Sequence, residues 1–261
     1  MTNNVEIRKL TSMNDLRKMQ EVEEAVWQMT PNPVHQTYTA LNHGGVILGA
    51  FDGQEMVGFL YSFAGFDGKQ VYLCSHMLGI KPCYRKDGLG ERMKLKQAEV
   101  AQELGYTIIT WTFDPLESLN AYLNLHKLRA TGAFYKKDHY GSMNDELNEG
   151  LPTDRIQIEW DINMASPAKK ITFDENKLMI DVTENGVPKS KLEIFNPIDD
   201  GWFVAVPDNF QFVKKRDINL AKEWRQKTRE AFQLLFNNGF IANDFIRNHS
   251  KEHSYYYFTK K

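Results

Sequence analysis

Hydrophobic and polar positions along the chain follow two periods, and each change of period marks an expected element. Alternation or short β-branched runs predict strands, and apolar residues three and four apart predict helices. The expected strands cover residues 5–10, 46–51, 56–63, 71–80, 106–114 and 154–162, and the expected helices cover residues 12–28, 34–45, 90–104 and 115–135. Three antiparallel strands followed by helix, strand, helix and strand indicate an α/β (α+β) fold with a mixed, mostly antiparallel sheet flanked by helices.

The pattern changes near Ser166-Pro167, where "MASPAKK" is typical of a linker. We therefore expect two domains, residues 1–165 and 166–261, the second a smaller α+β domain with a long amphipathic helix. The run Tyr255–Tyr257 is expected to form an edge strand. The segments "AYLNLHKLRATGAF" and "REAFQLLFNNGF" both run helix, glycine, aromatic residue and strand. They indicate either a degenerate half-repeat or the common helix–glycine–strand pattern.

Composition narrows the function classes. The chain has 32 basic and 34 acidic residues and a net charge of −2, so it lacks the basic excess of nucleic-acid-binding proteins. No apolar run approaches the ~18–20 residues of a membrane span, and the N-terminus lacks a signal peptide's apolar core. We expect a cytoplasmic protein. Cys74 and Cys83 are expected to be reduced, buried thiols, and no metal-type Cys/His spacing is present, so no metal is expected.

A glycine turn precedes the third expected helix, in "YRKDGLGER". Gly88 and Gly90 lie between a strand and a helix N-terminus, where four backbone N–H groups lack partners inside the helix. Glycines allow an anionic group to approach the backbone, and Arg85, Lys86 and Arg92 add positive charge. The turn matches neither GxGxxG nor GxxxxGK[ST]. These residues alone allow two interpretations, a phosphate-binding turn or a loop tightened by glycine.

The longer segment "LGIKPCYRKDGLGERM" resembles the acyl-CoA pyrophosphate loop of the GNAT superfamily of N-acyltransferases, whose pattern is Arg/Gln-x-x-Gly-x-Gly/Ala. Here that pattern is met by residues 85–90. The order of the expected elements also matches, and the resemblance covers about residues 4–165. The segments "GLPTDRIQIEW" and "AKEWRQKTREAFQLLFNNGF" resemble a small subgroup of predicted acetyltransferases with a C-terminal extension.

The resemblance implies acetyl-CoA as the acyl donor. It places the pantetheine arm along the end of the strand before the turn, the diphosphate on the turn, and an asparagine at the start of the next helix beside the arm or the amine. The implied residues are Met77, Leu78, Gly79, Ile80, Arg85, Lys86, Asp87, Gly88, Leu89, Gly90 and Asn120.

The implied reaction is direct acyl transfer to an amine, which needs a base because a protonated amine is not a nucleophile. His76 matches the histidine of aralkylamine-type members, and alternation would place it on one face with Cys74 and Leu78. A structural histidine is the alternative. The tyrosine acid of many members is replaced by Lys127, so either Tyr135 or Tyr140 serves as the acid or the thiolate leaves without one.

The sequence therefore predicts an N-acetyltransferase that acts on a small-molecule or amino-acid-like amine. One alternative is a catalytically weak acyl-CoA-binding sensor or scaffold of the same fold, and another is a protein acetylase with an open groove. A homodimer is left open.

Overall fold

The computed structural model describes residues 5–85, 88–143, 145, 147–164, 171–248 and 252–261. The chain forms two compact units, which we call the N-terminal unit (residues 1–111 and 160–165) and the C-terminal unit (residues 112–159 and 166–261). Each is described by itself. The domain boundary predicted near residue 166 lies beside residues 165–170, which are outside the described residues, and it stays a prediction.

The N-terminal unit contains one sheet whose strands follow the order β1-β2-β3-β4-β5. All neighbouring pairs are antiparallel except β4 and β5, which are parallel. This confirms the predicted mixed, mostly antiparallel sheet. The elements are β1 (Glu6–Lys9), α1 (Met13–Trp27), α2 (Val34–Asn42), β2 (Ile47–Asp52), β3 (Glu55–Phe66), β4 (Val71–Ile80), η1 (Pro82–Tyr84), α3 (Leu89–Glu103) and β5 (Ile108–Phe113).

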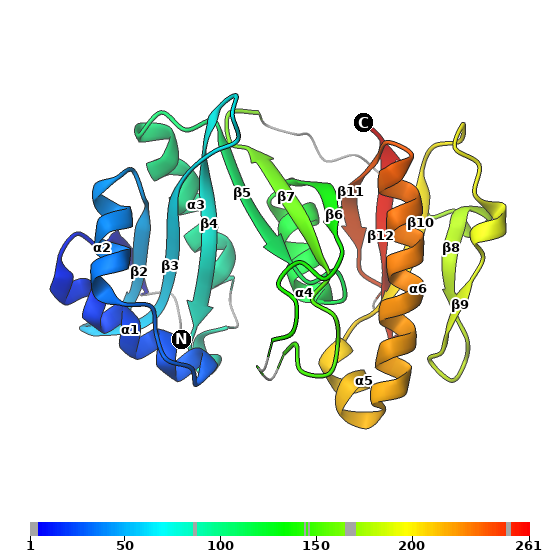
Figure 1. Ribbon diagram of the computed structural model, residues 1–261, viewed down its shortest axis with the longest axis horizontal. Helices are drawn as coiled ribbons and strands as arrows, with labels where there is room; N and C mark the ends of the chain where they lie inside the picture. Colours follow the sequence, from blue (N-terminus) through cyan, green and yellow to red (C-terminus); the bar gives the residue numbers. More distant parts are fainter. Residues whose placement is uncertain (1–4, 86–87, 144, 146, 165–170, 249–251) are drawn as a thin grey trace. The chain divides into compact units, whose positions relative to one another are not determined.

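Helices α1 and α2 cover one face of this sheet (Figure 1). The side chain of Ser12 caps α1 by accepting a hydrogen bond from the backbone N–H of Asp15, which satisfies one of the helix's unpaired donors. Leu16 and Met19 of α1 are fully buried against Phe59 and other apolar side chains of the sheet. Burial of this apolar stripe holds α1 on the strands that form the candidate site.

The C-terminal unit contains strands in the order β7-β6-β11-β12-β10-β8-β9. The division between the two units falls within β5 and within β7. The elements are α4 (Ser118–Ala121), η2 (Tyr122–Lys127), β6 (Thr131–Lys136), β7 (Arg155–Asp161), η3 (Glu175–Lys177), β8 (Leu178–Val182), β9 (Pro188–Ser190), η4 (Leu192–Ile194), β10 (Trp202–Pro207), α5 (Phe210–Arg216), α6 (Ile218–Asn237), β11 (Phe240–Ile246) and β12 (His253–Lys260).

Helix α6 runs alongside the strands of this unit (Figure 1) and contributes Trp224 and Phe232 to its buried core. Its N-cap is Asp217, whose carboxylate accepts from two backbone N–H groups of the first turn. Phe232 is fully buried, and its ring centroid lies 5.0 Å from that of Tyr256 and 5.2 Å from that of Phe258, both on β12. The amphipathic helix predicted here is confirmed, because its apolar face packs on the sheet.

Two sequence predictions about exposure are wrong. The run Tyr255–Tyr257 is not an edge strand, because Tyr256 pairs with Phe245 of β11 on one side and Val204 of β10 on the other. Aromatic alternation shows that a strand is buried but not how many neighbours it has. Cys83 is exposed in the short helix η1, and neither it nor Cys74 forms a disulfide.

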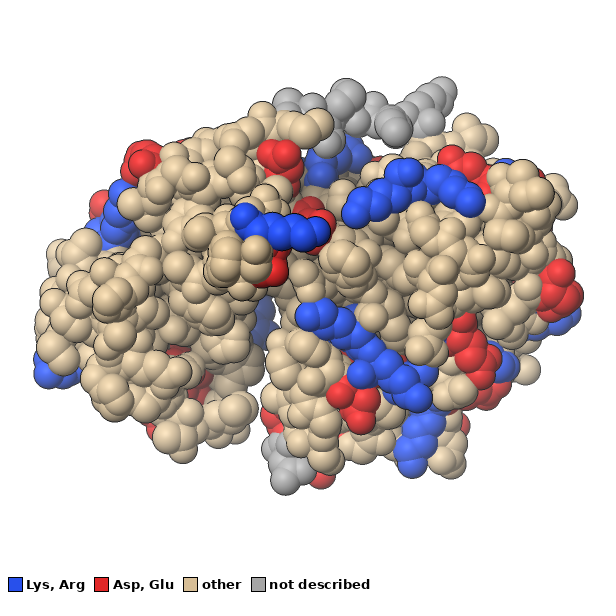
Figure 2. All heavy atoms as spheres, turned by 45° about the horizontal axis from the view of Figure 1, so that its top comes forward, with Lys and Arg blue, Asp and Glu red and all other residues tan. Residues whose placement is uncertain are grey.

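Charged side chains of both signs are interspersed on the face drawn in Figure 2. This distribution agrees with the near-zero net charge. In the part of the chain that the structure describes, no helix is both long and apolar enough to cross a membrane.

Candidate functional site

Strands β4 and β5 separate soon after they meet. Within the described residues, the two strands pair only at Leu73–Ile109 and Cys74–Thr110. On its other side β4 pairs with β3 as far as Ile80. The second half of β4, from Ser75 onward, therefore presents a backbone edge that β5 does not cover. An open strand edge is a surface to which an extended amide chain can add.

His76 is the extra residue of a β-bulge in β4. Tyr61 of β3 pairs with Met77, and the next β3 residue, Ser62, pairs with Ser75, so His76 has no opposite residue in the ladder. A bulge bends the strand and changes the direction of the side chains that follow it. Its place, at the start of the open edge, is one at which such bends re-aim functional side chains.

The bulge corrects the predicted face of Leu78. Residues opposite one another in a ladder point to the same face. Cys74 is opposite Phe63, whereas Leu78 is opposite Leu60, and these two β3 residues point to opposite faces because they are three residues apart. His76 lies on the face of Cys74, because it contacts the rings of Tyr61 and Phe63 described next. Simple alternation failed because the extra residue shifts the pattern after it.

The imidazole of His76 packs against two aromatic rings on the side of the sheet that α1 covers. Its ring centroid lies 5.9 Å from that of Tyr61, edge to face, and 5.7 Å from that of Phe63. Part of the side chain remains exposed. Burial against these rings lowers the pKa of His76 from its usual value of 6.5. The neutral form, which can accept a proton, is therefore favoured at neutral pH.

The glycine turn stands at the carboxyl end of β4, at the N-terminus of α3. Gly88 is the N-cap with φ 73°, in the left-handed region that favours glycine, and no side chain caps the helix there. Arg85 donates from Nε to the carbonyl of Ile80 at 2.9 Å, which ties the turn to the strand end. Lys86 and Asp87 lie outside the described residues. The described part of the turn suits an anion, because its backbone N–H groups have no side-chain cap.

Two residues near Met77, the neighbour of His76, were not found by sequence reasoning. Asn32, in the segment between α1 and α2, donates from Nδ2 to Glu23 Oε1 at 2.6 Å and also contacts the sulfur of Met77 at 3.2 Å. Glu23 is 5% exposed, and its Oε2 has no hydrogen-bond partner among the described residues. Burial raises the pKa of Glu23. The only sequence sign was one acidic residue on the apolar stripe of α1.

Lys94 occupies the opposite face of β4. Its Nζ donates to Ser75 Oγ at 2.7 Å and lies 3.6 Å from the centroid of Trp111. The side chain is 3% exposed, and burial lowers its pKa to about 7. Gln97, three residues further along α3, is fully buried, and both of its amide atoms lack hydrogen-bond partners among the described residues. These polar groups stand behind the strand that carries His76.

Lys94→Met should remove a pH dependence from folding stability. The unfolded pKa is ~10.4 and the folded one about 7, so between these values the unfolded chain binds more protons. Stability conferred by this site therefore rises with pH above about 7. We expect the free energy of unfolding of the wild type to gain ~2 kcal/mol relative to Lys94→Met between pH 7 and pH 9. Urea titrations at both pH values measure it.

The matched control is Lys96→Met, which removes a partly exposed lysine, paired with Glu99, from the same helix. It should keep the wild-type slope. Parallel slopes for the wild type and Lys94→Met would show that Lys94 stays charged in the folded protein above pH 7.

The remaining predicted residues belong to the C-terminal unit. The hydroxyl of Tyr135 donates to Asp154 Oδ2 at 2.5 Å, and burial followed by this carboxylate raises the pKa of Tyr135 well above its usual value. Tyr140 is half-exposed, and its hydroxyl lies 2.9 Å from Thr112 Oγ1. Asn120 is exposed on α4. The structure thus gives the two tyrosines different environments, one bound to a buried carboxylate and one accessible.

Comparison with known proteins agrees with this geometry. Residues 12–127 match the model of the Acetyltransferase (GNAT) family. The ribosomal-protein-S18-alanine N-acetyltransferase of Escherichia coli is 14% identical with a TM-score of 0.50, over 64% of this chain and 99% of that one. The yncA protein of Salmonella typhimurium, solved with its cofactor acetyl-CoA, is 14% identical with a TM-score of 0.51, over 65% and 100%.

An N-acetyltransferase from Staphylococcus aureus Mu50 is 15% identical with a TM-score of 0.50, over 61% of this chain and 99% of that one. At these identities the similarity establishes the fold. No curated protein matches the chain significantly in sequence.

Proposed function

We propose that this chain, whose residues 12–127 form a domain of the GNAT acetyltransferase family, transfers the acetyl group of acetyl-CoA to the amine of a small-molecule or amino-acid-like acceptor. The observation that carries the proposal is the edge of β4 that β5 leaves uncovered after Cys74. It ends at the glycine turn and carries His76 at its beginning. Donor arm, diphosphate and base thus have neighbouring positions along one strand.

The donor is held by backbone groups in this proposal. The amides of residues 77–80 pair with the pantetheine arm as an added strand would. The N–H groups at Gly88 and Gly90 bind the diphosphate at the N-terminus of α3, together with Lys86 and Asp87 outside the described residues. Arg85 supplies positive charge. Asn120 stays the proposed contact to the arm or the amine.

The chemistry needs a base, an oxyanion donor and a departing thiolate. Neutral His76 takes the proton from the acceptor ammonium, and the amine then attacks the thioester carbonyl. A backbone N–H at the bulge stabilises the oxyanion, because a bulge leaves ladder groups unpaired. Collapse of the intermediate forms the amide and releases the thiolate of coenzyme A. Tyr140 is the better proton donor, because the hydroxyl of Tyr135 is committed to Asp154.

The second candidate function is an acyl-CoA-binding sensor or scaffold with little turnover. The commitment of Tyr135 favours it, together with Lys127 at the position where many members have tyrosine. In that case acetyl-CoA would bind the same turn, but amines would not release free thiol from it.

Acetyl-CoA should raise the melting temperature, since a ligand that binds only the folded state stabilises it. Gly90→Glu should weaken that shift by placing a carboxylate where the diphosphate docks, while the first turn of a helix tolerates the acidic residue. Gln36→Glu adds the same charge at an exposed position on α2. This variant should keep the wild-type shift in melting temperature. Thermal unfolding with and without millimolar acetyl-CoA measures this.

The two candidate functions can be separated by measuring the release of free thiol from acetyl-CoA in the presence of a panel of amines. Amine-dependent release supports the transferase, and binding without release supports the sensor. A chain that acetyl-CoA does not stabilise at millimolar concentration would contradict both. The cytoplasmic location and the homodimer remain predictions, which cell fractionation and light scattering test.

A further inference from the structure

The C-terminal unit contains a cavity of about 380 Å³ at the ends of two parallel strands. Val182 and Pro207, which line it, are the last residues of β8 and β10. Val213 of α5 and Trp224 of α6 provide further apolar walls. Its volume lies within the ~300–1,000 Å³ typical of small-molecule sites. None of the residues considered for acetyl transfer lines it.

This cavity belongs to a strand–helix–strand–strand arrangement that occurs twice in the chain. The first runs β5, α4 with η2, β6 and β7, and the second runs β10, α5 with α6, β11 and β12. In each arrangement the last two strands form an antiparallel pair. The last strand also lies next to the first strand in the sheet. Ile162 after β7 donates to the carbonyl of Thr107 before β5, and Phe258 of β12 pairs with Trp202 of β10.

The strand registers of the two arrangements agree in detail. In the first, Gly132 is opposite Ile158 and Tyr135 is opposite Ile156, with a bulge between them. In the second, Ala242 is opposite Phe258 and Phe245 is opposite Tyr256, again with a bulge between them. Counted from the carboxyl ends of β6 and β11, three residue pairs separate the strand end from the bulge in both ladders. Bulges are specific features of a strand pair, so this agreement exceeds what a common helix–glycine–strand pattern requires.

The first strand of each arrangement also has a parallel neighbour. β5 lies beside β4, and β10 lies beside β8. Ligands of open α/β sheets bind outside the carboxyl ends of the strands. The glycine turn follows the carboxyl end of β4, and the cavity stands at the carboxyl ends of β8 and β10. The cavity therefore corresponds in topology to the proposed donor site, although its existence does not depend on that function.

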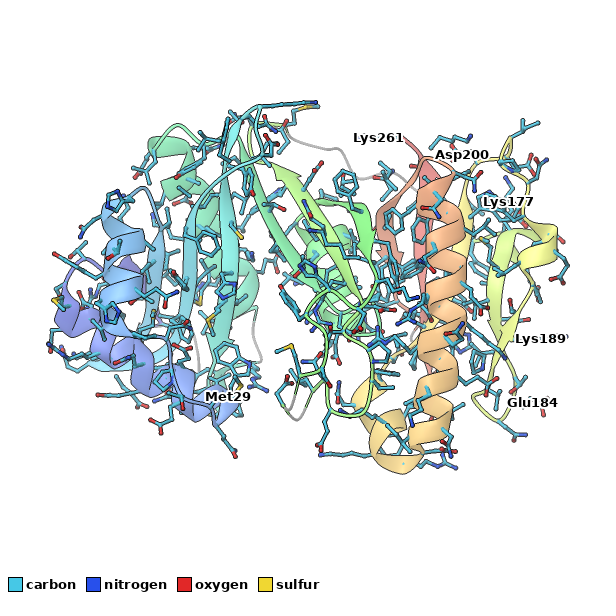
Figure 3. All side chains as sticks on the ribbon, viewed as in Figure 1. Met29, Lys177, Glu184, Lys189, Asp200 and Lys261 are labelled. Atoms are coloured by element: carbon cyan, nitrogen blue, oxygen red, sulfur yellow. The ribbon has the colours of Figure 1, made fainter. Side chains whose placement is uncertain are left out.

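The chemistry of the cavity differs from that of the glycine turn. β8 and β10 are joined through β9 and η4, and not through a helix that begins at a glycine turn. Among the described residues that line the cavity there is no lysine or arginine, and the titratable ones are Glu184, Glu252 and His253. The Nε2 atom of His253 lies 2.9 Å from the hydroxyl of Tyr255. Glu184 lies in the turn between β8 and β9 (Figure 3). Such a lining repels a diphosphate and attracts a cation.

We propose that the second arrangement is a degenerate copy of the first, and that its cavity binds a small-molecule amine. The ammonium group lies with the carboxylates of Glu184 and Glu252, and the apolar body packs on Val182, Pro207 and Val213. Glu184 and Glu252 thus set the ligand class. A protonated amine with a compact apolar body satisfies both parts of the lining.

Isothermal titration of the full chain with phenethylamine tests the proposal, with phenylacetate as the ligand of similar shape and opposite charge. We expect saturable binding of the amine and none of the acid. The double substitution Glu184→Gln and Glu252→Gln should weaken amine binding by about tenfold or more. Glu175→Gln with Glu193→Gln removes the same charge from exposed positions outside the cavity and should leave binding unchanged.

Val213→Phe provides an independent test, because it fills the cavity without changing its charge. It should abolish amine binding while leaving the stabilisation by acetyl-CoA as in the wild type. Amine binding that survives both the double substitution and Val213→Phe would place the site elsewhere and overturn the proposal. Absence of binding at millimolar amine would overturn it too, and so would preferential binding of phenylacetate. These measurements do not require turnover, so their failure is distinct from failure of the proposed acetyl transfer.

Discussion

His76→Ala should lower kcat/KM for amine acetylation by about 10²–10⁴-fold, the usual contribution of a general base. The substituted side chain is partly exposed and belongs to a bulge, so its loss should change the melting temperature little. Acetyl-CoA binding should also persist, because the turn at Gly88 and the backbone of β4 remain. Thiol release and thermal unfolding with acetyl-CoA measure the two effects separately.

The pH profile gives this prediction a further readout. Burial lowers the pKa of His76, so the neutral base is present at lower pH than for an exposed histidine. The rising limb of kcat/KM in the wild type should therefore lie below pH ~6.5. In His76→Ala this limb should disappear, and added imidazole should restore part of the rate. His35→Ala, an exposed histidine on α2, serves as the control. Unchanged turnover in His76→Ala would remove His76 from the mechanism.

Asp154→Ala should destabilise folding by about 3–5 kcal/mol, the cost of leaving a buried charged partner uncompensated. Asp154 is fully buried, and Arg229 donates to its two oxygens from Nε at 2.8 Å and from Nη2 at 2.7 Å. The hydroxyl of Tyr135 and the backbone N–H of Asp138 complete its hydrogen bonds. Equilibrium urea unfolding measures the loss.

The pH dependence of stability should change in the same variant. Burial raises the pKa of Asp154, but the hydrogen bonds from Arg229 and Tyr135 outweigh it, and the folded pKa is lowered. Its stabilisation is therefore present above the unfolded value of ~3.9 and is lost as pH falls through the folded value. Tyr135→Phe should cost less, about 1.5–3 kcal/mol, because Arg229 still compensates the carboxylate. Asp199→Ala, at an exposed position in the same unit, should cost less still, and a loss equal to that of Asp154→Ala would contradict this account.

Local pattern was sufficient for the elements and for the glycine turn. The alternation in β3 and β4 and the helical spacing in α1 and α3 depend on neighbouring residues, so the chain itself displays them. The turn before α3 was visible because glycine permits the left-handed backbone that such turns need, and Gly88 indeed has a positive φ. The family resemblance rested on these local features and their order, and it led to the fold that the structure has.

Features that depend on partners distant in the sequence required the tertiary structure. Asp154 is 75 positions from Arg229. The sequence around each residue does not indicate that the two pair. Lys94 looks like any lysine on a helix until Trp111 and Ser75 enclose it. The bulge at His76 exists only as a mismatch between two strands, so no single strand can display it.

The sequence by itself thus determined which segments form strands and helices and where a glycine turn precedes α3, because these follow from backbone preferences and the spacing of apolar side chains. Tertiary structure alone decided which face His76 and Leu78 take, which tyrosine hydroxyl is occupied, and that β12 lies inside a sheet. Those outcomes depend on pairing and burial between segments that are far apart along the chain. A short stretch of sequence does not include both partners of such a contact, so it cannot predict the contact's free energy.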